Sequence, residues 1–218
     1  MLWKEKLLRN SNLYLILDRD VADYDGLFTI AQKSLRAGVD IVQLRDKKGL
    51  ARDILQFSHR ILKLLKRQIP FIINDRVDLV LACGADGVHL GQEDIPLQTA
   101  QKMLPRKSII GISCQNLQDA QRAQNQGADY IGFGSVFKTL TKPNRRPMDL
   151  TLLAKVVGKI KIPVFAIGGI GLENIALVRE LGINQIAVCR EICCADNVEQ
   201  TTKVLKETLL SQIHPDSN

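Results

Sequence analysis

The chain alternates short apolar, β-branched runs with stretches of helical periodicity, and it does so eight times. The apolar runs cover residues 13–17, 41–44, 71–73, 87–90, 108–112, 130–133, 163–167 and 185–188. The clearest helix-period stretches cover residues 27–36, 51–66, 116–126, 150–159, 174–181 and 198–210. Runs that are apolar throughout, with helices between them, are typical of a parallel sheet covered on both faces. The pattern therefore predicts an α/β fold.

The number of units selects among parallel α/β folds. Eight strand–helix units in 218 residues match a closed (β/α)8 barrel, the TIM barrel, at the small end of its size range. An open doubly wound sheet is the second choice, but eight units favour closure. No linker or change of composition divides the chain, so we expect one domain over residues 1–218. The polar residues 211–218 are expected to form a frayed tail.

A short motif repeats along the chain. Residues 37–42, 83–88 and 126–131 share a Gly-x-Asp core, and residues 181–186 resemble them more weakly. Each copy lies where a predicted helix ends and a strand begins, so the glycine suits the left-handed position after a helix. The aspartate suits the turn into the strand. These positions lie at the N-terminal ends of the strands, where we expect a role in stability.

Composition narrows the class of protein and of partner. The sequence is 45% hydrophobic and carries a net charge of +7, yet no nucleic-acid-binding motif is present. A polyanionic small molecule such as a phosphate ester is therefore the favoured partner, with a merely solvated basic surface as the alternative. No apolar run is long enough for a membrane span, and no secretory signal is present. Five cysteines without a framework of pairs indicate a reducing, cytoplasmic setting. The sequence is compatible with a homo-oligomer.

Function in such barrels gathers just after the C-terminal ends of the strands. Two carboxylates, Asp75 and Asp94, follow neighbouring strands and suit Mg²⁺, which also keeps water and phosphate ligands. Cations at Arg45, Lys47 and Lys142 could converge on the same anion. The Gly168-Gly169 turn could supply backbone N–H groups to a phosphate. Together these features indicate a metal-assisted reaction on phosphorylated substrates.

Simpler interpretations exist for the same residues. Asp75 and Asp94 could each cap the helix that follows. Residues 138–142 could form a solvated loop. His89 is better explained as a hydrogen-bonded residue at the barrel mouth than as a metal ligand, because no second histidine is placed to join it.

The strand-end motifs resemble those of thiamine-phosphate synthases over roughly residues 12–192. The resemblance rests on QLRDK at 43–47, IINDRVDL at 72–79, GADGVHLGQED at 84–94, GADYIG at 127–132, TLTKP at 139–143 and AIGGI at 166–170. The family joins 4-amino-2-methyl-5-hydroxymethylpyrimidine diphosphate to (carboxy)hydroxyethylthiazole phosphate. Thiamine phosphate and pyrophosphate are its products, and it is a Mg²⁺-dependent transferase.

The resemblance assigns roles to single residues. It implies that Asp75 and Asp94 bind Mg²⁺ and that Arg45, Lys47, Ser113 and Lys142 are catalytic. It implies a substrate-binding set of Gln43, Leu44, Arg45, Asp46, Lys47, Asn74, Ser113, Thr139, Leu140, Thr141, Lys142, Gly169, Cys189 and Arg190. The implied reaction is dissociative: pyrophosphate leaves first, and the thiazole nitrogen then captures a pyrimidine-methyl cation.

The sequence departs from the usual family pattern on the thiazole side, at Cys114, Gln115, Ser135, Lys138 and Arg190. We expect Arg190 to contact the thiazole phosphate; the alternative is an outward side chain paired with Glu191 or Glu173. Two other functions stay open: a related thiazole tautomerase, and a non-catalytic barrel that binds thiamine intermediates. Residues 135–147, with their prolines and charge, are expected to form a lid.

Overall fold

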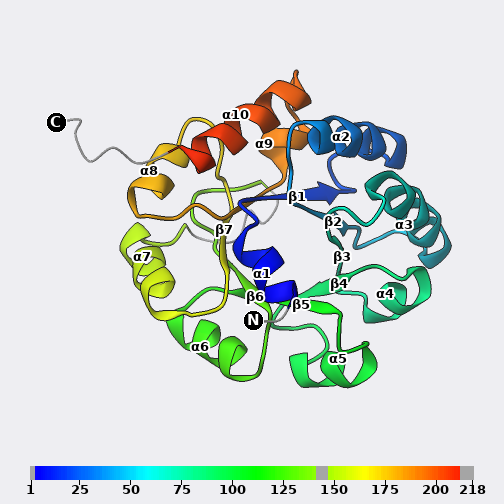
Figure 1. Cartoon of the computed structure of the whole chain (residues 1–218), viewed down its shortest axis with the longest axis horizontal. Helices are drawn as coiled ribbons and strands as arrows, with labels where there is room; N and C mark the ends of the chain where they lie inside the picture. The colour runs from blue at the N-terminus through cyan, green and yellow to red at the C-terminus, as the bar shows by residue number, and fades with distance from the viewer. Residues whose placement is uncertain (1–2, 141–146, 212–218) are drawn as a thin grey trace.

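Eight parallel strands form a closed barrel in the computed structural model, which describes residues 3–140 and 147–211 (Figure 1). The strands are β1 (Leu13–Asp18), β2 (Ile41–Arg45), β3 (Phe71–Asn74), β4 (Gly87–Leu90), β5 (Ile109–Cys114), β6 (Tyr130–Phe133), β7 (Val164–Ile167) and β8 (Ile186–Val188). Each strand pairs with its sequence neighbours, and β1 closes the ring on β8, with Leu13 opposite Ile186. The predicted barrel is therefore confirmed, and the open sheet is wrong.

The helices are α1 (Trp3–Arg9), α2 (Tyr24–Arg36), α3 (Ala51–Leu65), α4 (Val77–Cys83), α5 (Leu97–Met103), α6 (Leu117–Asn125), α7 (Leu150–Lys159), α8 (Ile175–Glu180), α9 (Arg190–Cys193) and α10 (Val198–Leu210). All the helices except α1 lie around the outside of the barrel (Figure 1). The periodicity did not indicate α1, α4, α5 and α9. Each has seven residues or fewer, so an apolar face repeats too few times to be recognised.

Apolar side chains form two layers. The larger cluster fills the space between strands and helices and includes Leu15, Phe57 and Val88. A smaller cluster fills the barrel interior, where the rings of Tyr14 and Tyr130 each pack edge-on against Phe165. These large rings lie in the barrel interior and form the floor of the cavity described below.

Helix α1 covers one end of the barrel, and Figure 1 shows it in the middle of the ring. Leu8 is fully buried against the interior cluster. Lys4 bonds Asp129, which precedes β6, and Gln185, which precedes β8, donates to the Leu8 carbonyl. These contacts place α1 at the N-terminal ends of the strands, so the opposite end carries the site.

The repeated aspartates join neighbouring strands. Asp40 accepts from the Leu13 N–H at 2.8 Å, Asp86 from Phe71 at 2.9 Å, and Asp129 from Ile110 at 2.8 Å. Each aspartate precedes an even-numbered strand, and its carboxylate accepts a backbone hydrogen bond near the start of the preceding strand. The expected structural role is thereby explained.

No helix in the described ranges is long and apolar enough to cross a membrane. Of the tail expected at residues 211–218, only Ser211 lies within the described residues.

Candidate active site

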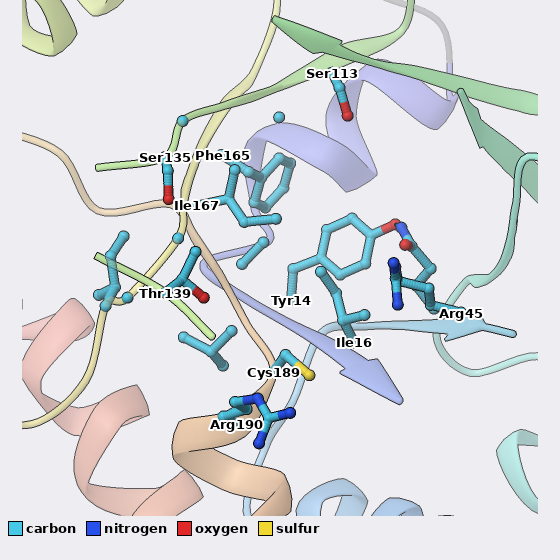
Figure 2. A pocket seen from close by; sticks show the side chains of 18 of the residues that line it. Tyr14, Ile16, Arg45, Ser113, Ser135, Thr139, Phe165, Ile167, Cys189 and Arg190 are labelled. Carbon is cyan, nitrogen blue, oxygen red and sulfur yellow. The ribbon is translucent and has the colours of Figure 1, made fainter. Parts of the chain in front are cut away.

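A cavity of about 280 Å³ lies at the C-terminal ends of the strands (Figure 2). Tyr14, Phe165 and Ile167 contribute apolar surface to it. Its lining includes nine of the expected site residues: Gln43, Arg45, Asn74, Ser113, Thr139, Leu140, Gly169, Cys189 and Arg190. The barrel brings together residues that are as much as 147 positions apart in the sequence, because all its parallel strands have their C-terminal ends on one face. This is the arrangement that the strand-end rule predicted.

The other expected residues lie elsewhere. Leu44 is buried in the layer between strands and helices. Asp46 accepts hydrogen bonds from the Tyr24 hydroxyl at 2.7 Å and the Gly49 N–H at 2.7 Å, so it organises the loop after β2. Thr141 and Lys142 lie outside the described residues, as does most of the second half of the expected lid.

Asp75 and Asp94 are neighbours, as predicted from their strands. Asp75 follows β3 with φ of 63°, a left-handed conformation that aspartate tolerates better than most residues. Lys47 Nζ lies 3.1 Å from Asp75 Oδ2. Burial raises the pKa of Asp75, the adjacent Asp94 carboxylate raises it further, and Lys47 opposes both effects. Two carboxylates held together in this way attract a cation.

The helix-cap interpretation of these carboxylates is wrong. Helix α4 begins after Arg76 and α5 after Pro96, and neither helix has a side-chain cap. Asp94 instead accepts from the Gly91 N–H within its own loop, at 2.6 Å.

The acidic pair suits a divalent ion that brings other ligands. Within the described part of the chain, no group of three or more His, Cys, Asp or Glu side chains could hold a metal. Mg²⁺ commonly uses only one or two carboxylates, with waters and substrate phosphates completing its shell. Asp75 and Asp94 therefore fit Mg²⁺ bound together with a phosphorylated substrate.

Arg45 is oriented by an acidic partner that sequence reasoning missed. Its guanidinium lies 2.8 Å and 3.0 Å from the two oxygens of Asp18, which is 1% exposed, and 3.5 Å from Asp20. Asp18 ends β1, so its position at a strand end was the available signal. The paired guanidinium keeps a fixed direction and still lines the cavity (Figure 2).

A second cationic corner lies where β7 and β8 end. Gly168 and Gly169 have φ of 104° and 65°, and a Cβ on Gly169 would lie 2.3 Å from the Lys138 carbonyl oxygen. Arg190 opens α9 beside this turn, and its Nε is buried with no hydrogen-bond partner among the described residues. Figure 2 shows Arg190 at the edge of the cavity next to Cys189.

The outward pairing of Arg190 is not observed. Within residues 3–140 and 147–211, Arg190 forms no salt bridge with Glu173 or Glu191. The Glu191 carboxylate instead accepts from the Leu172 N–H at 2.9 Å. A buried guanidinium nitrogen without a protein acceptor suits an anionic ligand.

A chain of hydrogen bonds crosses the barrel beneath the cavity. Gln43 Nε2 donates to the Tyr14 hydroxyl at 2.7 Å, and the Tyr14 and Tyr130 hydroxyls are 2.8 Å apart. His89 Nδ1 lies 3.0 Å from the Tyr130 hydroxyl, and its Nε2 lies 2.9 Å from Ser113 Oγ. The interpretation of His89 as a hydrogen-bonded mouth residue is confirmed. The two tyrosines were missed because they stand inside strands rather than after them.

The family assignment rests on a family model. A model described as thiamine monophosphate synthase matches residues 13–192, which include every strand and most of the cavity lining. The chain belongs to the thiamine monophosphate synthase family.

Individual relatives agree with this family assignment. The chain is 40% identical to a thiamine-phosphate synthase of Halalkalibacterium halodurans, covering 94% of this chain and 98% of that one. It is 37% identical to that of Fusobacterium nucleatum, over 90% and 98%. The solved thiamine phosphate pyrophosphorylase of Pyrococcus furiosus superposes with a TM-score of 0.84 at 35% identity, over 95% and 99%. The expected transferase class and thiamine-phosphate synthase activity are confirmed.

Proposed function

We propose that this family member joins its two substrates in the cavity described above, with Mg²⁺ bound by Asp75 and Asp94. The observation that carries the proposal is the acidic pair with Lys47 at 3.1 Å, next to a cavity lined by Arg45 and Arg190. Carboxylates on one side and cations on both sides match two phosphorylated molecules and one metal ion. A thiazole tautomerase, which transfers only protons, would have little use for this arrangement.

The pyrimidine diphosphate is assigned to the side of the cavity next to the C-terminal ends of β2–β5. Arg45 and Lys47 provide positive charge for the diphosphate, with Asn74 and Ser113 as neutral hydrogen-bonding groups. Gln43 is 3% exposed and offers amide groups to the aminopyrimidine ring. Tyr14 and Phe165 form the apolar floor. Mg²⁺, when bound, would neutralise charge that builds up on the departing diphosphate.

The reaction needs charge stabilisation more than a base. The bond between the pyrimidine methylene carbon and the diphosphate oxygen breaks, and its electron pair leaves with the diphosphate. The thiazole nitrogen then donates its lone pair to the methylene carbon, and the positive charge stays on the thiazolium product. With hydroxyethylthiazole phosphate as the acceptor no proton is gained or lost in these two steps, so fixed cations and hydrogen-bond donors carry the catalysis.

The thiazole phosphate is assigned to the corner formed by Gly169, Cys189 and Arg190. Thr139 and Leu140 line the same side of the cavity. The roles expected for Thr141 and Lys142 remain predictions. We further propose that the protein acts in the cytoplasm on these small phosphorylated molecules, which its five free cysteines support.

The test is release of pyrophosphate and formation of thiamine phosphate from the two substrates as Mg²⁺ is varied. We expect Asp94→Asn to lower kcat on the order of 100-fold, because one metal ligand is lost. It should also raise the Mg²⁺ concentration that gives half-maximal rate. Asp25→Asn, at a side chain 83% exposed on α2, is the matched control. A wild-type rate for Asp75→Asn and Asp94→Asn at limiting Mg²⁺ would refute the metal assignment.

A further inference from the structure

The hydrogen-bond chain beneath the cavity is built into the barrel interior. Tyr14 and Tyr130 are each 1% exposed, and both contribute a hydroxyl to the chain. A Cβ on Gly111 would lie 2.1 Å from the Tyr130 ring and 2.5 Å from its hydroxyl. Only glycine at position 111 therefore leaves room for this ring. Figure 2 shows two members of this hydrogen-bond chain, Tyr14 and Ser113, among the side chains that line the cavity.

The hydrogen bonds of this chain can all be assigned the same direction of donation, from Gln43 toward Ser113. Burial raises the pKa of both phenols, so each hydroxyl keeps its proton and must donate it. Gln43 Nε2 can only donate, so the Tyr14 oxygen accepts from it, and Tyr14 donates onward to Tyr130. Tyr130 then donates to His89 Nδ1. A neutral imidazole that accepts at Nδ1 carries its proton on Nε2.

The direction of donation along the hydrogen-bond chain determines whether Ser113 acts as a donor or as an acceptor toward a ligand. His89 Nε2–H donates to Ser113 Oγ at 2.9 Å, so the serine oxygen accepts from the protein. The serine proton is then left to point toward the cavity that Ser113 lines. If the chain ran the other way, Ser113 would donate to His89 and present only lone pairs to the ligand, and lone pairs repel an anionic oxygen.

We propose that Tyr130 is a positioning residue that, through His89, holds Ser113 as a hydrogen-bond donor to an oxygen of the leaving diphosphate. The proposal rests on the proposed function for the identity of the ligand. The direction of the chain does not depend on the ligand and can be measured in the free protein. Tyr130 itself acts from within the barrel, through two intervening hydrogen bonds.

The first experiment is ¹⁵N NMR of the His89 imidazole in the ligand-free protein. We expect the proton on Nε2 in the wild type. Tyr14→Phe should keep that tautomer, because Tyr130 still donates to His89. Tyr130→Phe should give a mixture of tautomers, because Nδ1 loses the Tyr130 donor while Ser113 can either accept from Nε2 or donate to it. A wild-type His89 protonated on Nδ1 overturns the proposal, and this result needs no variant to fold.

The second experiment separates positioning from stability. We expect Tyr130→Phe to lower kcat on the order of tenfold and to leave KM for the thiazole phosphate unchanged. In a Ser113→Ala background the same substitution should have no further effect on kcat, since the donor it positions is gone. Thr202→Val removes another fully buried hydroxyl, on α10, and is the control; it should leave kcat and the His89 tautomer unchanged.

Each outcome separates this proposal from the proposed function. Equal losses from Tyr130→Phe in the wild-type and Ser113→Ala backgrounds would show that the tyrosine only supports the fold, and would overturn the positioning role. If the wild type makes no thiamine phosphate, the proposed function fails. A proton found on His89 Nε2 would still support the direction of the chain in that case.

Discussion

At the scale of single residues, Arg190 is informative because its Nε is buried beside the cavity without a partner among the described residues. We expect Arg190→Ser to raise KM for the thiazole phosphate on the order of tenfold, because a charged hydrogen bond contributes about 1.5–3 kcal/mol. KM for the pyrimidine diphosphate should stay nearly constant. Steady-state kinetics with each substrate varied in turn measure both values. Arg36→Ser, at an exposed arginine on α2, is the control, and equal behaviour of the two variants would contradict the assignment.

Gly169 tests the same corner through the backbone. A Cβ there would meet the Lys138 carbonyl oxygen at 2.3 Å, and φ of 65° is strained for alanine. We expect Gly169→Ala to displace the segment at 137–138 and to raise KM for the thiazole phosphate. The free energy of unfolding should fall by about 1 kcal/mol or more.

Gly158 provides a matched control for that substitution. It lies in α7, and a Cβ there would meet nothing within 4 Å. Gly158→Ala should leave the kinetics unchanged and raise the free energy of unfolding by about 0.5–1 kcal/mol, because alanine has the higher helix propensity. Urea unfolding of both variants measures the contrast. Loss of stability in Gly158→Ala, or none in Gly169→Ala, would contradict this explanation.

At the scale of elements, the repeated aspartates explain why similar sequence recurs every two units. Asp86 shows the pattern: its carboxylate accepts from the Phe71 N–H, and its backbone carbonyl accepts from the Ile109 N–H at 2.9 Å. One residue before β4 therefore connects to the starts of β3 and β5. The weaker fourth copy differs, since Asn184 accepts from Asn12 through its backbone carbonyl.

We expect Asp86→Ala to lower the free energy of unfolding by about 1–3 kcal/mol, because the N–H of fully buried Phe71 loses its acceptor. Asp86→Asn keeps an acceptor oxygen and should recover most of that loss. Chemical unfolding measures both variants, and Asp25→Ala controls for removal of an exposed carboxylate. If the Asn and Ala variants lose equal stability, the hydrogen bond is not the cause.

At the scale of the whole molecule, α1 closes the end of the barrel opposite the cavity. Leu8 is fully buried beneath the ring cluster that forms the cavity floor. We expect Leu8→Ala to lower the free energy of unfolding by about 2–5 kcal/mol, because it leaves a void in a packed interior. Leu210→Ala, at a side chain 60% exposed on α10, should change it by less than about 0.5 kcal/mol. Comparable losses in the two variants would show that α1 does not seal the barrel.

The sequence alone predicted the features that depend on local pattern. The strands were placed within about two residues, since each is a β-branched run between turn signals. Closure followed from their number, and the strand-end rule led to Asp75, Asp94 and Arg45. These inferences succeed because every strand of a parallel barrel ends at the same face, independently of the conformation of the loops.

Tertiary structure decided how those residues are used. The pairing of Arg45 with Asp18 depends on the register of β1 against β2, where the two residues lie directly opposite each other. Whether the Arg190 side chain pairs with a carboxylate or lines the cavity depends on the path of α9. The hydrogen-bond chain from Gln43 to Ser113 depends on five strands (β1, β2, β4, β5 and β6) that direct side chains inward at matching heights. A local pattern specifies which residues face inward, but hydrogen-bond partners across a barrel are chosen by its closure and packing, which bring distant strands within 3 Å of each other's side chains.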